Sequence, residues 1–134
     1  MYRFSKFSGI ISYIRYDIPQ GIKSLFIWFK VIWNDRSWDW VFIFYILRKK
    51  LELMEHTFRV HGHAVDSEKT AHEIKICKLL LDRLIKADYI MTPEKRKIFP
   101  IKGSKMIDYE DMMMNQDLSL LTKIINRKVF TWWD

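Results

Sequence analysis

Apolar residues recur along this chain at intervals of three and four, with little alternation of apolar and polar neighbours. Only 4 glycines and 3 prolines interrupt the pattern in 134 residues. Both features are typical of helices, so the chain is predicted to be all-α. The pattern predicts four helices, over about Pro19–Trp33, Ser37–Val60, Glu68–Ile90 and Leu118–Thr131. Residues 1–16 are expected to form an N-terminal arm or a fifth, short helix.

Polar residues stand where helices are expected to begin, because Asp, Ser and Thr accept hydrogen bonds from the free N–H groups of a first turn. The expected caps are Asp17 before Pro19, Ser37 with Asp39 in the first turn, Asp66 with Ser67, and Asp117. Gly62 is expected to end the second helix in the left-handed conformation that glycine adopts easily.

The first helix carries apolar side chains on two sides, and the start of the second is apolar all round over 40–47. The second and third helices are expected to form an antiparallel hairpin, with the first helix laid across it. The predicted fold is therefore a single domain over 1–134, a small bundle of four to five helices. Its surplus of apolar helix surface favours self-association into a homo-oligomer.

Composition adds a preference for anionic partners. The formal net charge is +7, and aromatic residues make up 16% of the chain. Residues 92–105 are expected to be a basic loop that carries Lys95, Arg96 and Lys97. The single Cys77 and the absence of a secretory pattern favour a reducing cytoplasm, and no apolar window is long enough to predict a transmembrane segment.

The turn over Asn34–Trp40 has the residue types of a nucleotide pocket. Arg36 could hold a phosphate with its planar guanidinium while Trp38 or Trp40 stacks on a base, with Asp39 beside them. The alternative is structural: the carboxylates pair with Arg36 and the rings pack between helices. Both interpretations stay open on the sequence alone.

Other candidate ligand-binding residues are Arg83, expected at an interface on the third helix, and the Lys95–Arg96–Lys97 run. His61 and His63 lie near two further histidines, but their spacing matches no standard zinc motif, so no metal or other cofactor is expected. Phosphate-binding glycine loops and the common catalytic motifs are missing from the sequence, which favours a binding protein over an enzyme.

Three segments resemble a group of small, uncharacterised proteins of tailed bacteriophages. They are the IW-DR-WDW turn at 32–40, the LLDRLI-DY helix at 79–89 and the WWD end at 132–134, and the resemblance extends from Asp17 to Asp134. No activity comes with that group. The resemblance implies a place in the host cytoplasm and, by association, a role in binding and inactivating host defence components, including nucleotide immune signals.

The sequence therefore favours a non-enzymatic, homo-oligomeric phage-type protein that sequesters an anionic small molecule. A cyclic nucleotide or an ADP-ribose-type signal is the expected ligand class. The alternative is a nucleic-acid or host-protein binding module that inhibits its partner, such as a host defence protein. A third class is a structural or membrane-peripheral accessory protein.

Overall fold

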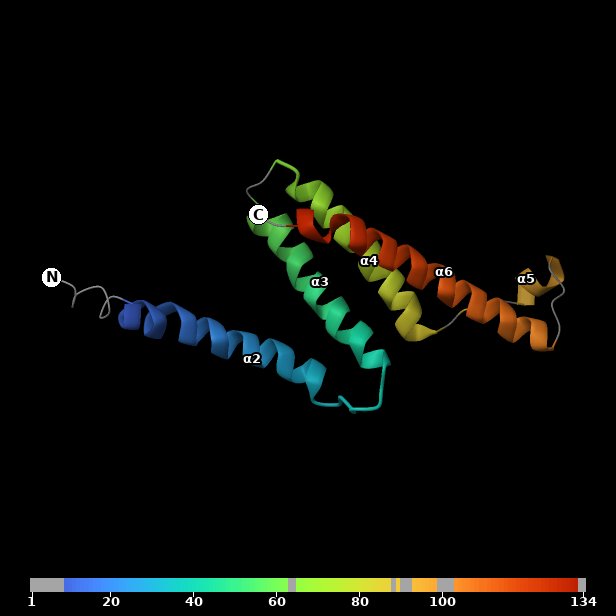
Figure 1. The fold of residues 1–134 in the computed structure, drawn as a ribbon, viewed down its shortest axis with the longest axis horizontal. Helices are drawn as coiled ribbons and strands as arrows, with labels where there is room; N and C mark the ends of the chain where they lie inside the picture. Colours follow the sequence, from blue (N-terminus) through green and yellow to red (C-terminus); the bar gives the residue numbers. More distant parts are fainter. Residues whose placement is uncertain (1–8, 63–64, 88, 90–92, 99–102, 133–134) are drawn as a thin grey trace. The chain divides into compact units, whose positions relative to one another are not determined.

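The structure, a computed structural model, describes residues 9–62, 65–87, 89, 93–98 and 103–132. These residues are helical or in connecting turns and include no strand, which confirms the all-α prediction (Figure 1). The elements are η1 (Tyr13–Asp17, a π-helix), α2 (Ile18–Ile32), α3 (Val41–His61), α4 (Ser67–Lys86), α5 (Pro93–Ile98), α6 (Ser104–Lys128) and η2 (Val129–Thr131, a 3₁₀-helix).

The chain divides into two compact units, Met1–Asp39 and Trp40–Asp134. The larger unit contains the predicted antiparallel hairpin, formed by α3 and α4, and α6 packs against α4 (Figure 1). That the first helix lies across the hairpin stays a prediction.

Helix α4 is the centre of the larger unit, because α3 and α6 both pack against it. It contributes most of the buried apolar side chains, as the recurrence of its apolar residues at intervals of three and four predicts. The core consists of Leu51 and Phe58 of α3, Ala71, Ile74, Cys77, Leu80, Leu81 and Leu84 of α4, Leu121 of α6, and Trp132.

Ion pairs also connect α3 with α4 along the hairpin. Arg48 pairs with Asp82, Lys78 Nζ lies 2.8 Å from a Glu55 carboxylate oxygen, and Arg59 Nη1 lies 2.7 Å from Glu68 Oε1. Because Glu55 is almost enclosed, burial opposes its ionisation, yet hydrogen bonds from Lys78 and Arg59 outweigh burial and lower the pKa of Glu55. The charges therefore favour one register of the two helices.

Gly62 ends α3 next to the predicted boundary, but its expected left-handed conformation is wrong, since its φ is −64°. The lack of room for a Cβ atom explains why this residue is a glycine. A Cβ there would overlap the carbonyl oxygen of Phe58 and lie 2.5 Å from Cβ of Ser67. The left-handed residue is instead Ala87, with φ 47°, which ends α4 after Lys86 and well before the predicted Ile90.

Pro19 does not begin a helix as predicted. Residues 9–12 are already helical, and η1 leads directly into α2. Asp17 has helical dihedral angles and no side-chain capping bond, while Ile18 donates its N–H to the Tyr13 carbonyl, a π-type bond. A proline inside a helix removes one backbone bond and crowds the preceding turn, and a widened π turn accommodates it.

Two other predicted starts are also wrong. Helix α3 begins at Val41, so Ser37 and Asp39 lie in a turn in which the Asp39 N–H donates to the Arg36 carbonyl (2.8 Å). Helix α6 begins at Ser104, which makes Asp117 a buried residue of the helix interior instead of a cap. The predicted basic loop at 92–105 contains the short helix α5.

We expect Leu81→Ala to lower the free energy of unfolding by about 2–5 kcal/mol, because Leu81 is fully buried and its truncation leaves a cavity between the helices. The matched control is Leu79→Ala on the same helix, where the side chain is 54% exposed and the cost should stay below about 1 kcal/mol. Denaturant unfolding measures both variants. If both variants lose the same free energy of unfolding, Leu81 does not lie in the core and Leu79 outside it.

Candidate anion-binding groove

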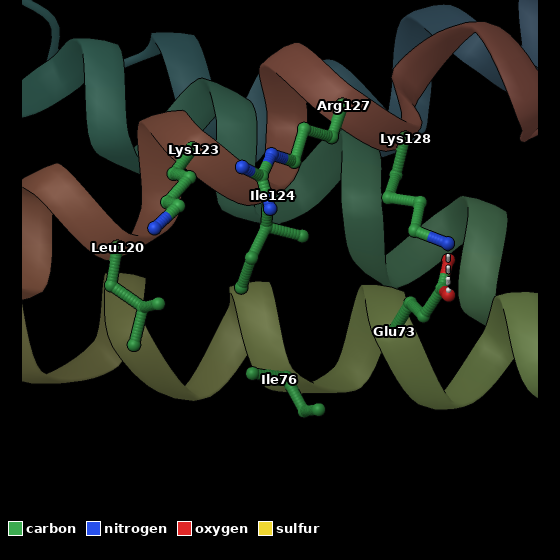
Figure 2. A pocket seen from close by; sticks show the side chains of 7 residues that line it. All are labelled: Glu73, Ile76, Leu120, Lys123, Ile124, Arg127 and Lys128. Atoms are coloured by element: carbon green, nitrogen blue, oxygen red, sulfur yellow. Dashed lines mark ion pairs between the residues drawn. The ribbon is translucent and has the colours of Figure 1, made fainter.

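An open groove of about 310 Å³ runs between α4 and α6 in the larger unit. Its apolar lining consists of Ile76 of α4 with Leu120 and Ile124 of α6 (Figure 2). The charged lining consists of Glu73 of α4 with Lys123, Arg127 and Lys128 of α6. The groove therefore combines an apolar surface with three cations and one carboxylate.

The cations come from consecutive turns of α6. Lys123 and Arg127 are four residues apart, so they lie on one side of the helix, next to Ile124. Both side chains are exposed, and neither has an ion-pair partner among the described residues. Two cations without a counter-charge can attract an anion to this groove.

Lys128 has a different role, because it is paired within the protein. Its Nζ lies 3.1 Å from Glu73 Oε1, a contact visible in Figure 2, and the indole of Trp132 donates to Glu73 Oε2 at 3.2 Å. Burial raises the pKa of Glu73, but these two hydrogen bonds outweigh it and the net pKa is lowered. Glu73 is thus ionised at neutral pH and connects α4 to the C-terminal end of α6.

The residues of the predicted nucleotide pocket at 34–40 do not line this groove. Trp38 is 81% exposed and Trp40 is also exposed. Arg36 is exposed as well and donates to the backbone carbonyl of Asp35 at 3.1 Å. Asp39 is half-buried. The role of these residues in ligand binding stays a prediction.

Arg83 contributes to an internal network. Its Nε lies 3.0 Å from Asp117 Oδ2, and its guanidinium lies 5.7 Å from the ring centre of Tyr89. The Tyr89 hydroxyl donates to the same Asp117 oxygen at 2.7 Å. Burial, followed by the bond to Asp117, raises the pKa of Tyr89, so Tyr89 remains a proton donor. Arg83 therefore joins α4 to α6, while its side chain is still half exposed.

The remaining candidates are only partly described. Lys97 is exposed on α5, whereas the side chains of Lys95 and Arg96 lie outside the described residues. The rings of His56 and His61 stack with centres 6.5 Å apart, and His63 lies outside the described residues. The described part of the chain contains no group of three His, Cys, Asp or Glu residues that could hold a metal ion.

Sequence reasoning missed the cations of the groove because it considered only the apolar stripe of the predicted last helix, although that helix contains all three of them. A signal was present. Lys123, Arg127 and Lys128 recur with helical spacing beside Leu120 and Ile124, which predicts a basic edge along an apolar stripe. What the sequence does not give is the neighbour, Ile76 of α4, that turns this edge into a groove.

No family model, no curated protein and no solved structure matches this chain. The resemblance to phage proteins therefore depends on the three motifs alone. In the structure, Arg83, Tyr89 and Trp132 of those motifs make contacts between helices. Among the described helices, none combines the length and apolarity that crossing a membrane requires.

We expect the Glu73 contacts to make stability depend on pH. The folded-state pKa of Glu73 is lowered below its usual 4.5, so ionised Glu73 stabilises the fold above that pH. This contribution is lost as the pH falls through the lowered folded-state pKa. Glu73→Gln should therefore lower the melting temperature at about pH 7 and have a smaller effect at about pH 3.

Thermal melts of the parent and Glu73→Gln at both pH values measure this difference. Glu110→Gln is the control on α6, because Glu110 forms no ion pair among the described residues. A loss from Glu73→Gln that is the same at both pH values would contradict a role for the ionised carboxylate.

Proposed function

We propose that this protein is a non-enzymatic binding protein that captures an amphipathic anion in the groove between α4 and α6. One observation carries the proposal: Lys123 and Arg127, without ion-pair partners among the described residues, lie beside an apolar surface formed by Ile76 and Ile124. Cations attract the charged part of such a ligand, and the aliphatic side chains contact its apolar part.

A nucleotide has both parts. Its phosphate suits Arg127, which can donate two parallel hydrogen bonds, and Lys123, which acts as a point charge. The flat face of its base suits the aliphatic surface of Ile76 and Ile124. The volume of about 310 Å³ lies at the lower end of the range for small-molecule pockets, which favours one nucleotide unit in the groove. In a phage, as the resemblance implies, the ligand would be a nucleotide immune signal.

Two titratable groups support binding in preference to catalysis. Glu73 is the carboxylate of the groove, and its hydrogen bonds to Lys128 and Trp132 lower its pKa, whereas a general acid or base works best with a pKa near the working pH. The Cys77 thiol is fully buried, and burial raises its pKa to about 11. It is therefore a poor candidate for a nucleophile at neutral pH.

Self-association remains part of the proposal, and the first half of α3 offers a surface for it. Ile43 is 65% exposed, and Ile46, three residues later, is also exposed on the side away from Leu51 of the core. Exposed apolar side chains at helical spacing are the usual contact of a helical homo-oligomer.

We expect the double variant Lys123→Gln, Arg127→Gln to weaken nucleotide binding by about tenfold or more, because it removes two charge-assisted contacts. Affinity should also depend less steeply on salt concentration in the variant. Isothermal titration calorimetry with cyclic dinucleotides, linear dinucleotides, ADP-ribose and single-stranded DNA measures both effects.

The matched control is Lys75→Gln, Lys86→Gln, which removes two exposed charges from α4 outside the groove. It should bind like the parent protein. Equal losses of affinity in the two double variants would mean that binding depends only on net charge, which would refute the groove as the binding site. If the parent protein binds none of these probes, the nucleotide assignment is refuted. Preference for single-stranded DNA would favour the nucleic-acid alternative.

We expect the parent protein to sediment as a species heavier than its 16.4 kDa monomer at micromolar concentration. Ile43→Glu with Ile46→Glu should shift it to the monomer, because each copy would then place carboxylates in an apolar contact. Analytical ultracentrifugation measures both states. A monomeric parent protein would contradict self-association.

A further inference from the structure

The N-terminal unit contains a helix whose strongest apolar face is exposed. None of the residues of α2 is buried. The exposed apolar residues on one side are spaced by one, three or four positions, as one face of a helix requires: Ile18, Ile22, Leu25, Phe26, Phe29, Ile32 and Trp33. Phe26 is 72% exposed and Trp33 is 67% exposed.

The size of this face calls for an apolar partner. A large side chain has an area of about 150–250 Å², so seven that are about half exposed present roughly 500–900 Å². The largest apolar patch of a typical monomer has about 300–600 Å² and is often functional. The helical residues before α2 add further exposed apolar side chains, Ile10, Ile11, Tyr13, Ile14 and Tyr16.

Cations border the face. Lys23 and Lys30 are two helical turns apart and lie along the edge next to Phe26 and Trp33. Neither forms an ion pair among the described residues. Residues 1–34 of the sequence contain five basic residues and one acid, Asp17.

A shallow hollow of about 440 Å³ on the same unit combines both features. Arg15 and Lys23 line it together with the apolar side chains of Tyr16, Ile22 and Phe26. A lipid headgroup phosphate suits the two cations, and the start of an acyl chain suits the apolar lining.

We propose that the helical segment 9–33 docks the protein on an anionic lipid surface, lying in the plane of the interface. Charge decides between a membrane and a second copy of the chain. Two copies paired through this face would bring two sets of Arg15, Lys23 and Lys30 together, with Asp17 as the only acid of the segment. Anionic headgroups neutralise the same cations while the apolar face enters the acyl boundary.

The aromatic residues support this orientation. Tyr16 and Trp33, near the two ends of the exposed face, are residues that favour the boundary between headgroups and acyl chains, because each has an apolar ring and a polar atom. The lysine stems can lie along the apolar region while their ammonium groups reach the headgroups.

The test is flotation of the full-length protein with vesicles. Vesicles of phosphatidylcholine and phosphatidylglycerol in equal parts should carry the protein, and vesicles of phosphatidylcholine alone should carry far less. Leu25→Gln with Phe26→Gln and Phe29→Gln should weaken binding to the anionic vesicles by about tenfold or more, since these side chains supply the buried apolar area. Circular dichroism and thermal melts check that the variant keeps its fold.

A charge variant tests the second half of the proposal. Lys23→Gln with Lys30→Gln should weaken binding to the anionic vesicles by roughly tenfold and reduce its salt dependence. The matched control, Lys50→Gln with Lys75→Gln, removes two exposed lysines of the larger unit and should bind like the parent protein.

Binding that is unchanged by the apolar triple variant, or no binding to either vesicle, would overturn the proposal. A dimer in ultracentrifugation that the triple variant abolishes, without vesicle binding by the parent, would assign this face to a second copy. Neither result would affect the groove on α4 and α6, whose residues are unchanged in these variants.

Discussion

The carboxylate of Asp117 fixes the position of α6 against α4. A charged group that is 4% exposed in the middle of a helix loses most of its hydration, so it is stable only where fixed donors replace water. Two donors do so, the Tyr89 hydroxyl at 2.7 Å and the Arg83 guanidinium at 3.0 Å. Apolar packing alone tolerates small shifts of one helix along another, but this network does not, because a shift would leave the carboxylate without partners.

The groove follows from that register. Leu120, Ile124 and Arg127 lie three, seven and ten residues after Asp117, so helical spacing places them on the side of α6 that faces α4. At the far end, the indole of Trp132 donates to Glu73 of α4. The groove therefore lies between two polar contacts that join the same two helices, and these contacts favour one position of the helix that carries its cations.

The sequence predicts the hairpin well and the polar contacts poorly. Buried positions such as Ile74 and Leu81 follow directly from apolar spacing, because most helical stability in a protein comes from packing one face. Asp117 misleads for a physical reason: a lone aspartate before an apolar stripe is the usual sign of a helix start, and its role here depends on Tyr89, 28 residues earlier. Arg83 and Lys123 are likewise given their roles by residues on another helix.

The two units use apolar residues in opposite ways. In the larger unit, α4 is almost balanced between apolar and polar positions, and its apolar residues are enclosed by α3 and α6. In the N-terminal unit, α2 has far more apolar residues than its length needs for one packed face, and none of them is buried. Burial of such a surface is favourable by about 25 cal/mol per Å², so within this unit the face lacks the apolar contact that would stabilise it. A face of this kind with cations along one edge is best explained by an apolar partner with anionic groups at its surface.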